Sequence, residues 1–256
     1  MQIPLLELKN VSLSYHSEKG ETPAISDISF QIQQGEFLAI VGPSGCGKST
    51  LLNLISGLLI PETGEILINR KQMSENHMNI GYMLQKDHLF EWRTIYSNVL
   101  LGLEIQKKVT SEKKKMIDDL LLTYGLDKFK AAKPSQLSGG MRQRAALIRT
   151  LALEPDLLLL DEPFSALDYQ TRLNVSDDIG NIIKHESKTA ILVTHDISEA
   201  ISMADRVIIL TSRPASVQTT VPIQLDIPNR TPLLSRNAPD FKNYFNLIWK
   251  ELNRHE

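Results

Sequence analysis

The sequence predicts an α/β fold with a mostly parallel β-sheet core, and three patterns indicate it. A glycine-rich stretch, residues 42–50, lies between the apolar run Phe37–Val41 and an apolar helix start at residues 51–55. Continuous apolar runs recur at residues 157–161, 189–195 and 206–210, as in buried parallel strands. Segments with helical periodicity separate these runs, and this alternation predicts a sheet covered on both faces.

The N-terminal part predicts an antiparallel β subdomain. Residues 6–15 and 25–32 alternate between apolar and polar, as strands with one solvated face do, and the polar residues 16–22 between them predict a hairpin loop. Residues 61–64 predict a turn, and residues 65–69 a short strand. A brief apolar run at residues 80–85 predicts a buried strand that ends at Gln85.

A helical subdomain is expected at about residues 94–153, inserted between two parts of the sheet domain. Within it, residues 111–122 and 142–151 have helical spacing, and residues 134–140 interrupt the pattern. The lysines at 113–115 are interpreted as the solvated face of the first helix. A C-terminal extension is expected at about residues 212–256, where prolines interrupt all regular structure until a short amphipathic helix at Phe241–Leu252.

Composition excludes several classes of protein. The chain has 256 residues, 42% hydrophobic and 23% charged, with a net charge of −2, which gives no reason to expect nucleic acid as a partner. No apolar run approaches the ~20 residues needed to span a bilayer, and the first residues lack the features of a secretory signal. Cys46 is the single cysteine, so no internal disulfide is expected, which fits a reducing compartment.

The glycine-rich stretch matches the phosphate-loop pattern G-x-x-x-x-G-K-[ST] and reads Gly42-Pro43-Ser44-Gly45-Cys46-Gly47-Lys48-Ser49-Thr50. Its glycines let successive N–H groups point inward, and the positive end of the following helix favours a phosphate there. Lys48 would reach the outer phosphates, and Ser49 would place its hydroxyl on Mg²⁺. The alternative, a glycine turn with an exposed lysine, leaves this density of special residues unexplained.

Two acids close the apolar run at 157–160. Asp161 is in position to hold Mg²⁺, usually through water, and Glu162 to take a proton from the water that attacks a γ-phosphate. The alternative for this pair is a helix cap after a strand, since Asp before Glu-Pro is common at helix starts.

Other polar residues lie where the same sheet edge is expected. His195 also ends an apolar strand, which would put it near the same phosphate, although a lone histidine is more often structural. Gln85 is either a metal- and water-positioning amide or a polar strand end. Ser138-Gly139-Gly140 is a second glycine-rich turn before a helix, and it is either an anion site or an ordinary helix N-terminus capped by Ser138. Cys46 has no base near it in sequence and is interpreted as a small filler.

Taken together, these motifs closely resemble the ATP-binding subunit of an ATP-binding-cassette (ABC) transporter, a cassette of the P-loop NTPase class. The resemblance runs in register from Tyr15, similar to the aromatic that stacks on adenine, to His195, similar to the switch histidine. Between them lie segments similar to Walker A (42–50), the Q-loop glutamine (Gln85), the signature (137–143), Walker B with its catalytic glutamate (157–162) and the D-loop (165–168).

The resemblance implies one nucleotide-binding domain over residues 1–256 that binds ATP and Mg²⁺ and hydrolyses ATP. The implied catalytic residues are Lys48, Gln85, Glu162 and His195, and the implied metal ligands are Ser49, Gln85 and Asp161. The implied nucleotide-binding residues are Tyr15, residues 42–50, Ser138, Gly139 and Gly140.

The resemblance also implies partners. Two cassettes meet head to tail, and each ATP is pressed between the Walker A of one chain and the signature of the other. This chain has one set of motifs, so the second cassette is expected to be another copy or a similar subunit. Separate permease subunits would cross the membrane, a solute-binding protein would act indirectly, and the cassette would lie on the cytoplasmic face of the membrane.

The segment after the Q-loop, with Asn98-Val99 and Gly102-Leu103, resembles the nitrate, sulfonate and taurine importer branch, and the signature resembles those of bacterial import systems. Residues 89–94, Leu-Phe-Glu-Trp-Arg-Thr, follow the Q-loop segment and would face the permease. The signature continues Gly-Gly-Met-Arg-Gln-Arg, with Met141 where the commoner signature has glutamine. The alternatives are an importer for another small solute, such as bicarbonate or a vitamin precursor, an exporter cassette, and a non-transport cassette acting on nucleic acid or ribosomes.

Alkylation of Cys46 is predicted to block nucleotide binding, because an added group would crowd the phosphate cradle. The measurement is the ATP affinity after stoichiometric modification, with a Cys46→Ala variant treated in parallel as the control. Full ATP affinity of the alkylated protein would contradict the placement of Cys46 in the cradle.

Overall fold

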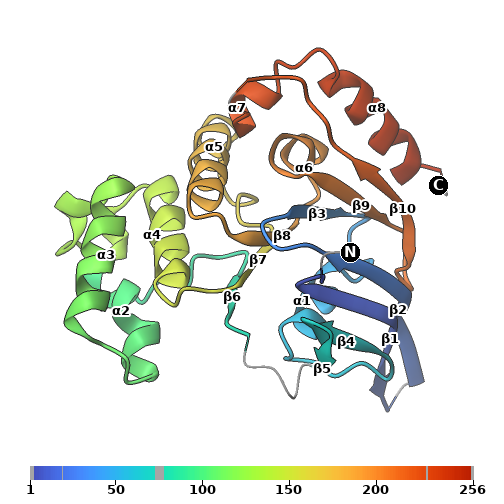
Figure 1. The fold of residues 1–256 in the computed structure, drawn as a ribbon, viewed down its shortest axis with the longest axis horizontal. Helices are drawn as coiled ribbons and strands as arrows, with labels where there is room; N and C mark the ends of the chain where they lie inside the picture. The colour runs from blue at the N-terminus through green and yellow to red at the C-terminus, as the bar shows by residue number, and fades with distance from the viewer. Residues whose placement is uncertain (1–2, 19, 73–77, 229, 255–256) are drawn as a thin grey trace.

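Two β-sheets and a lobe of helices make up the protein (Figure 1). The structure, a computed structural model, describes residues 3–18, 20–72, 78–228 and 230–254. Its larger sheet has the strand order β10-β9-β3-β8-β7-β6, in which β9 to β6 are parallel and β10 is antiparallel to β9. The strands are β3 (Phe37–Val41), β6 (Ile80–Met83), β7 (Leu157–Asp161), β8 (Thr189–Val193), β9 (Arg206–Leu210) and β10 (Val217–Pro222). The predicted α/β fold with a mostly parallel core is confirmed.

Successive side chains of the central strands enter two separate cores. In β3, Leu38 and Ile40 join a core with helix α1 (Lys48–Ile55) and the smaller sheet. Ala39 and Val41 join the opposite core, which includes residues of α5 (Tyr169–His185), α6 (Ile197–Met203) and α8 (Phe241–Leu252). Since both faces are covered, every residue of β3, β7 and β8 is buried, which explains why these strands are continuous apolar runs.

The smaller sheet is antiparallel, with the order β2-β1-β4-β5. Its strands are β1 (Leu6–Ser17), β2 (Gly20–Ile32), β4 (Thr63–Ile68) and β5 (Lys71–Gln72). The expected hairpin loop at 16–22 is wrong in extent, because β1 and β2 stay paired as far as Ser17 and Gly20. Residue 19, within that expected loop, lies outside the described residues.

Three helices form the lobe at the left of Figure 1: α2 (Ile95–Ile105), α3 (Ser111–Thr123) and α4 (Gly139–Leu151). They enclose a core of their own that includes Val99, Ile117 and Ile148. Helix α4 also contributes Leu147 to the core of the large sheet, so it connects the lobe to the sheet. It begins at Gly139, three residues before the helical pattern in the sequence, because its first turn contains the glycines that sequence reasoning assigned to a break.

The C-terminal segment has more regular structure than the sequence predicts. Prolines do not interrupt all regular structure, since β10 and the short helix α7 (Pro232–Ser235) precede α8. Pro222 is the last residue of an edge strand and Pro232 the first residue of a helix, positions where a missing N–H costs little. Residues 229 and 255–256 of the expected extension lie outside the described residues. Helix α8 has the predicted bounds, and its Ile248 is fully buried in the core beside the large sheet.

Within the described residues, no helix combines the length and apolarity that crossing a membrane requires.

A matched pair of glycines tests the packing of the smaller sheet. Gly64 has φ +81°, and a Cβ there would lie 2.3 Å from the carbonyl oxygens of Lys9 and Asn10, whereas Gly35 has φ +79° and open space around its Cβ direction. Both Gly→Ala changes strain the backbone, but only Gly64→Ala also forces β1 and β4 apart. We expect Gly64→Ala to lower the free energy of unfolding by on the order of 3 kcal/mol and Gly35→Ala by about 1 kcal/mol, measured by urea denaturation. Equal losses would contradict the close approach.

Candidate functional site

The candidate site lies at the edge where the parallel strands end. β3 pairs with β8 through Ile40 and Val193, and β7 pairs with β8 through Asp161 and Val193. The residues that follow these strands therefore emerge at one edge, which in sheets of this kind is where ligands bind. Glu162 N donates to the carbonyl of Val193 at 2.8 Å, which fixes the turn after β7 against the end of β8.

The phosphate-loop sequence forms a tight turn between β3 and α1. Gly45 and Gly47 have φ of +73° and +124°, a backbone conformation that favours glycine. Lys48 is 6% exposed, and its Nζ donates to the carbonyls of Gly42 and Pro43, each at 2.9 Å. The lysine thus folds over its own loop, and two of its three N–H donors hold the turn. The alternative of an exposed lysine in a glycine turn is wrong.

The N-terminus of α1 differs from those of helices α2 to α7. Helices α2 to α7 are each preceded by an N-cap Ser, Thr or Asp whose side chain accepts a hydrogen bond from a first-turn N–H. The N-cap residue of α1 is Gly47, which has no side chain to form such a bond. Its first-turn N–H groups and the positive end of its dipole are therefore available to an anion in the loop.

Ser49 and Asp161 meet across the loop. Ser49 Oγ donates to Asp161 Oδ1 at 3.2 Å. Asp161 is 9% exposed, and burial raises the pKa of its carboxyl; the nearby Glu162 also raises this pKa, while the hydrogen bond from Ser49 lowers it. The pKa of the neighbouring Tyr82 phenol is raised by burial and by Asp161. A divalent cation would relieve this crowding of negative charge.

Gln85 and His195, which follow the ends of β6 and β8, both contact the Glu162 carboxylate. His195 Nδ1 lies 3.2 Å from Glu162 Oε2, and Gln85 Nε2 donates to the same oxygen at 3.4 Å. Gln85 Nε2 also donates to Ser165 Oγ at 3.1 Å. Both Gln85 and His195 lie two residues beyond the ends of their strands, since β6 ends at Met83 and β8 at Val193, so the strands are shorter than the sequence predicts.

The backbone at Glu162 is strained. Its φ is +44°, in the left-handed region that a residue with a Cβ rarely adopts. The helix-cap alternative for the Asp161-Glu162 pair is wrong, because the next helix, α5, begins only at Tyr169 with Asp168 as its cap. Strain of this kind costs on the order of 1–3 kcal/mol, and it is concentrated at functional sites.

Two more residues of the predicted set lie beside the loop. Tyr15 is 42% exposed, and its hydroxyl forms a hydrogen bond with Thr50 Oγ1 at 3.1 Å. Cys46 is 1% exposed, and burial raises the pKa of its thiol. This agrees with its interpretation as a filler, and it means that the thiol will react slowly with an alkylating reagent.

The turn Ser138-Gly139-Gly140, called the signature turn below, is placed apart from this group. Ser138 is the N-cap of α4, and its Oγ accepts from Met141 N at 3.4 Å, as the helix-cap alternative predicts. A Cβ on Gly139 would lie 2.9 Å from Leu167. Among the hydrogen bonds and ion pairs of the described residues, none joins the signature turn to Lys48, Ser49 or Asp161.

The contacts that fix Thr194, the residue before His195, were not predicted from the sequence. Thr194 N donates to the carbonyl of Ile40 at 3.2 Å, and Thr194 Oγ1 donates to the buried Glu199 at 2.6 Å. From α5, Arg172 donates to the carbonyl of Leu167 at 3.1 Å and lies 3.9 Å from Glu199. The available signal was the Thr-His-Asp run before α6, in which Asp196 caps the helix.

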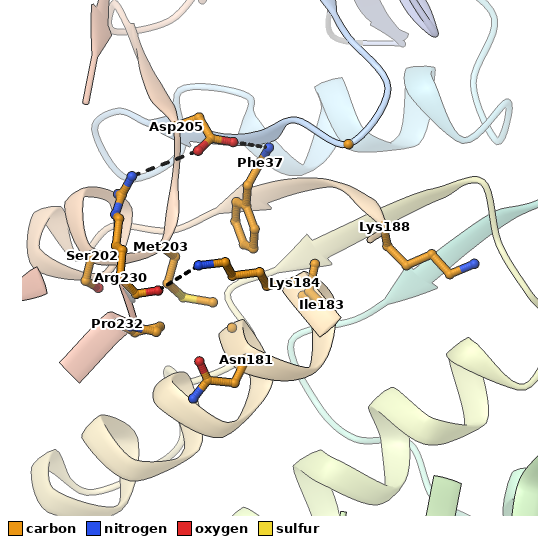
Figure 2. A pocket seen from close by; sticks show the side chains of 12 residues that line it. Phe37, Asn181, Ile183, Lys184, Lys188, Ser202, Met203, Asp205, Arg230 and Pro232 are labelled. Carbon is orange, nitrogen blue, oxygen red and sulfur yellow. Dashed lines mark hydrogen bonds and ion pairs between the residues drawn. The ribbon is translucent and has the colours of Figure 1, made fainter. Parts of the chain in front are cut away.

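A cavity of about 210 Å³ lies elsewhere, between α5, α6, the start of β3 and the C-terminal segment (Figure 2). Asp205 accepts from Phe37 N at 2.8 Å and faces Arg230, and Lys184 donates to the Arg230 carbonyl. Phe37 is the first residue of β3. The cavity is therefore at the opposite edge of the sheet from the phosphate loop.

The residues at the carboxyl edge fit magnesium and a phosphate chain. Within the described part of the chain, no cluster of three His, Cys, Asp or Glu side chains could hold a metal alone. Mg²⁺ commonly binds through one or two protein oxygens, water and substrate phosphates, and the Ser49 hydroxyl and Asp161 carboxylate supply such oxygens. The fold and these residues define the class as a P-loop nucleotide-binding protein.

Comparison with known proteins gives the family. The model of the ABC transporter family matches residues 25–165. An uncharacterized ABC transporter ATP-binding protein of Bacillus subtilis is 46% identical over 248 residues, which cover 97% of this chain and 95% of that protein. An aliphatic sulfonates import ATP-binding protein of Bacillus licheniformis is 37% identical over 236 residues, covering 92% and 89% of the two chains. The chain belongs to the ABC transporter family.

A solved structure agrees with this assignment. It is the dimeric, post-hydrolysis state of an ATP-binding cassette bound to ADP and Pi, 31% identical, with a TM-score of 0.72, covering 86% of this chain and 99% of that one. The present chain is an ABC ATP-binding cassette and an ATPase.

The buried Glu199 gives a pH prediction. Burial raises the pKa of its carboxyl from 4.5 to about 7; Asp196 adds to this, and Thr194, Arg172 and His195 oppose it. Because the folded state holds the proton more tightly, the stability from this group is complete below about pH 4.5 and is lost as the pH rises through about 7.

We therefore expect Glu199→Gln to gain stability relative to the wild type between about pH 5 and pH 8, by at most a few kcal/mol. The measurement is the free energy of unfolding in urea at each pH. Parallel pH curves for the two proteins would contradict the raised pKa.

Proposed function

We propose that this chain is the ATP-hydrolysing subunit of an importer for a small, anionic solute of the nitrate, sulfonate or taurine kind. One observation carries the hydrolytic part: the Glu162 carboxylate lies against both Gln85 and His195, beside the Ser49–Asp161 pair. Import is supported by the Bacillus licheniformis relative, which is named as an aliphatic sulfonates import ATP-binding protein. The Leu-Phe-Glu-Trp-Arg-Thr segment, with Trp92 73% exposed, supports a permease-facing surface there.

In this proposal the residues hold the nucleotide, hold the metal or act on the attacking water, and Gln85 serves both the metal and the Glu162 carboxylate. The N–H groups of residues 42–50 and the Lys48 ammonium hold the phosphates, and Tyr15 stacks on the adenine. Ser49, Asp161 and Gln85 would hold Mg²⁺, which would neutralise charge on the phosphate oxygens. Glu162 accepts the proton of the attacking water, and His195, at 3.2 Å from Glu162, fixes the orientation of the reacting groups.

The separation of the signature turn from the phosphate loop supports a composite site. Ser138, Gly139 and Gly140 make no hydrogen bond or ion pair with Lys48, Ser49 or Asp161 in the described residues. The Ser138 cap takes only the Met141 N–H, so the N–H groups of the two glycines and the positive end of the α4 dipole still favour an anion. We infer that the turn serves the ATP of a second, head-to-tail copy, as the dimeric state of the solved cassette supports. The chain then lies at the cytoplasmic face of the membrane with permease subunits, and a solute-binding protein acts indirectly.

Three alternatives are weighed against this proposal. A cassette for another small solute, such as bicarbonate or a vitamin precursor, would have the same site, since the solute contacts other chains. An exporter cassette is disfavoured by the import relative. A cassette acting on nucleic acid is disfavoured by the net charge of −2.

Glu162→Gln is expected to reduce the ATPase rate by on the order of 10²–10⁴-fold, because an amide cannot accept the proton of the attacking water. ATP binding is expected to persist, because the amide keeps the size of the side chain and can still accept a hydrogen bond from Gln85. The measurements are steady-state phosphate release and ATP affinity. Glu154→Gln, in the helical lobe, is the control and is expected to be unchanged. An unchanged rate for Glu162→Gln would contradict the role of Glu162.

A further inference from the structure

We propose that Arg142 is a positioning residue that holds the signature turn and Gln85 in a fixed relation. In the sequence, this arginine belongs to the variant continuation Gly-Gly-Met-Arg-Gln-Arg, which the proposed roles of the site residues do not use. The inference rests on the proposed function, because it presumes the role of Gln85 at Glu162. It adds a residue that touches neither ATP nor the reacting atoms.

Arg142 bonds the signature turn through its backbone and the Gln85 segment through its side chain. Arg142 N donates to the carbonyl of Ser138 at 2.9 Å. Its guanidinium binds Asp87 with two parallel bonds, Nε to Oδ2 at 2.8 Å and Nη2 to Oδ1 at 3.1 Å. Nη1 lies 2.8 Å from Glu91 Oε1. A planar guanidinium with two bonds to one carboxylate fixes direction as well as distance.

The segment after Gln85 is held at both ends. From α4, Arg149 donates to the carbonyls of Asp87 and His88, each at 2.7 Å. Arg142 and Arg149 lie about two turns apart on the same face of α4, and both bond this segment. At the other end, Asn98 of α2, which is fully buried, bonds both the N–H and the carbonyl of Phe90. The segment therefore moves with α4 and the helical lobe.

The contacts continue from Asp87 through Gln85 to the carboxylate of Glu162. Asp87 is two residues from Gln85, so the two Cα atoms are at most about 7 Å apart. Gln85 Nε2 then donates to Ser165 Oγ at 3.1 Å and to Glu162 Oε2 at 3.4 Å. A displacement of the signature turn thus reaches Glu162 through Arg142, Asp87 and Gln85, a contiguous path of packed and bonded groups.

In a head-to-tail dimer, the Arg142–Asp87 pair lies between residues that serve two different ATP molecules. Gln85 serves the ATP on its own phosphate loop, and the signature turn serves the ATP of the second copy. The Arg142–Asp87 pair therefore connects the two composite sites within one chain, and its loss leaves Gln85 poorly placed while the phosphate loop remains intact.

The test uses the full-length chain with Mg-ATP and measures kcat, KM for ATP and the thermal midpoint. The variants are Arg142→Gln, Arg142→Lys and Asp87→Asn. The matched control is Lys130→Gln in the same lobe, because Lys130 also pairs with two carboxylates, Asp118 at 2.8 Å and Asp127 at 2.6 Å.

Arg142→Gln is expected to lower kcat on the order of tenfold or more with KM for ATP changed less than about twofold, and Lys130→Gln to change neither. Arg142→Lys keeps the charge but not the paired geometry, and is expected to recover part of the loss. Asp87→Asn tests the same bond from its other side and is expected to lower kcat, which keeps the proposal falsifiable if Arg142→Gln does not fold.

A double variant distinguishes an effect of Arg142 on the position of Gln85 from a general loss of stability or folding. In a Gln85→Ala background, Arg142→Gln is expected to cause no further loss of kcat, because its effect passes through Gln85. Multiplied losses, or a kcat for Arg142→Gln and Asp87→Asn equal to that of Lys130→Gln, would overturn the proposal. If Glu162→Gln abolishes hydrolysis in the same assay, the proposed function stands whichever way Arg142 behaves.

Discussion

The structure depends on the register of three parallel strands. Pairing of Ile40 with Val193 and of Asp161 with Val193 makes β3, β8 and β7 end together. Asp161 is the last residue of β7. The phosphate loop, Glu162 and His195 follow the ends of β3, β7 and β8, and Gln85 follows the end of β6. The buried strands are rigid because both faces are packed, so the loops after them start from fixed positions. Polar residues can then be held close together at an edge that the core leaves open.

At the carboxyl edge of the sheet, buried negative and positive groups lie close together without a ligand, and this arrangement favours the binding of a phosphate with a divalent cation. Asp161 and Glu162 are adjacent acids, and burial raises the pKa of Asp161. The opposing positive groups are the Lys48 ammonium and the uncapped start of α1. Each of these groups gains from a ligand that has negative phosphates and a bound divalent cation. The strained backbone at Glu162, with φ +44°, is tolerated because Val193 and the side chains of Gln85 and His195 fix the turn.

Local patterns in the sequence were enough to predict the fold class, the bounds of β3, β7, β9 and α8, and a shared edge for Gln85, Glu162 and His195. These features depend on periodicity and on strands that end together. β10 was missed because proline usually interrupts a strand, although the last residue of an edge strand, here Pro222, can be proline. The Arg142–Asp87 pair was missed because its partners are 55 residues apart, and no local pattern reports such a contact. The Thr194–Glu199 bond depends likewise on how α6 turns back after β8.

The central claim is that ATP is split only when the signature turn of a second copy closes over the phosphate loop. The most direct measurement is a crystal structure of the chain with Mg²⁺ and a non-hydrolysable ATP analogue. We expect a dimer in which Lys48 contacts the phosphates and Ser138 of the second copy lies within hydrogen-bond distance, about 3 Å, of the terminal phosphate. An analogue held in the loop of a monomer, with every Ser138 far from the terminal phosphate, would contradict it.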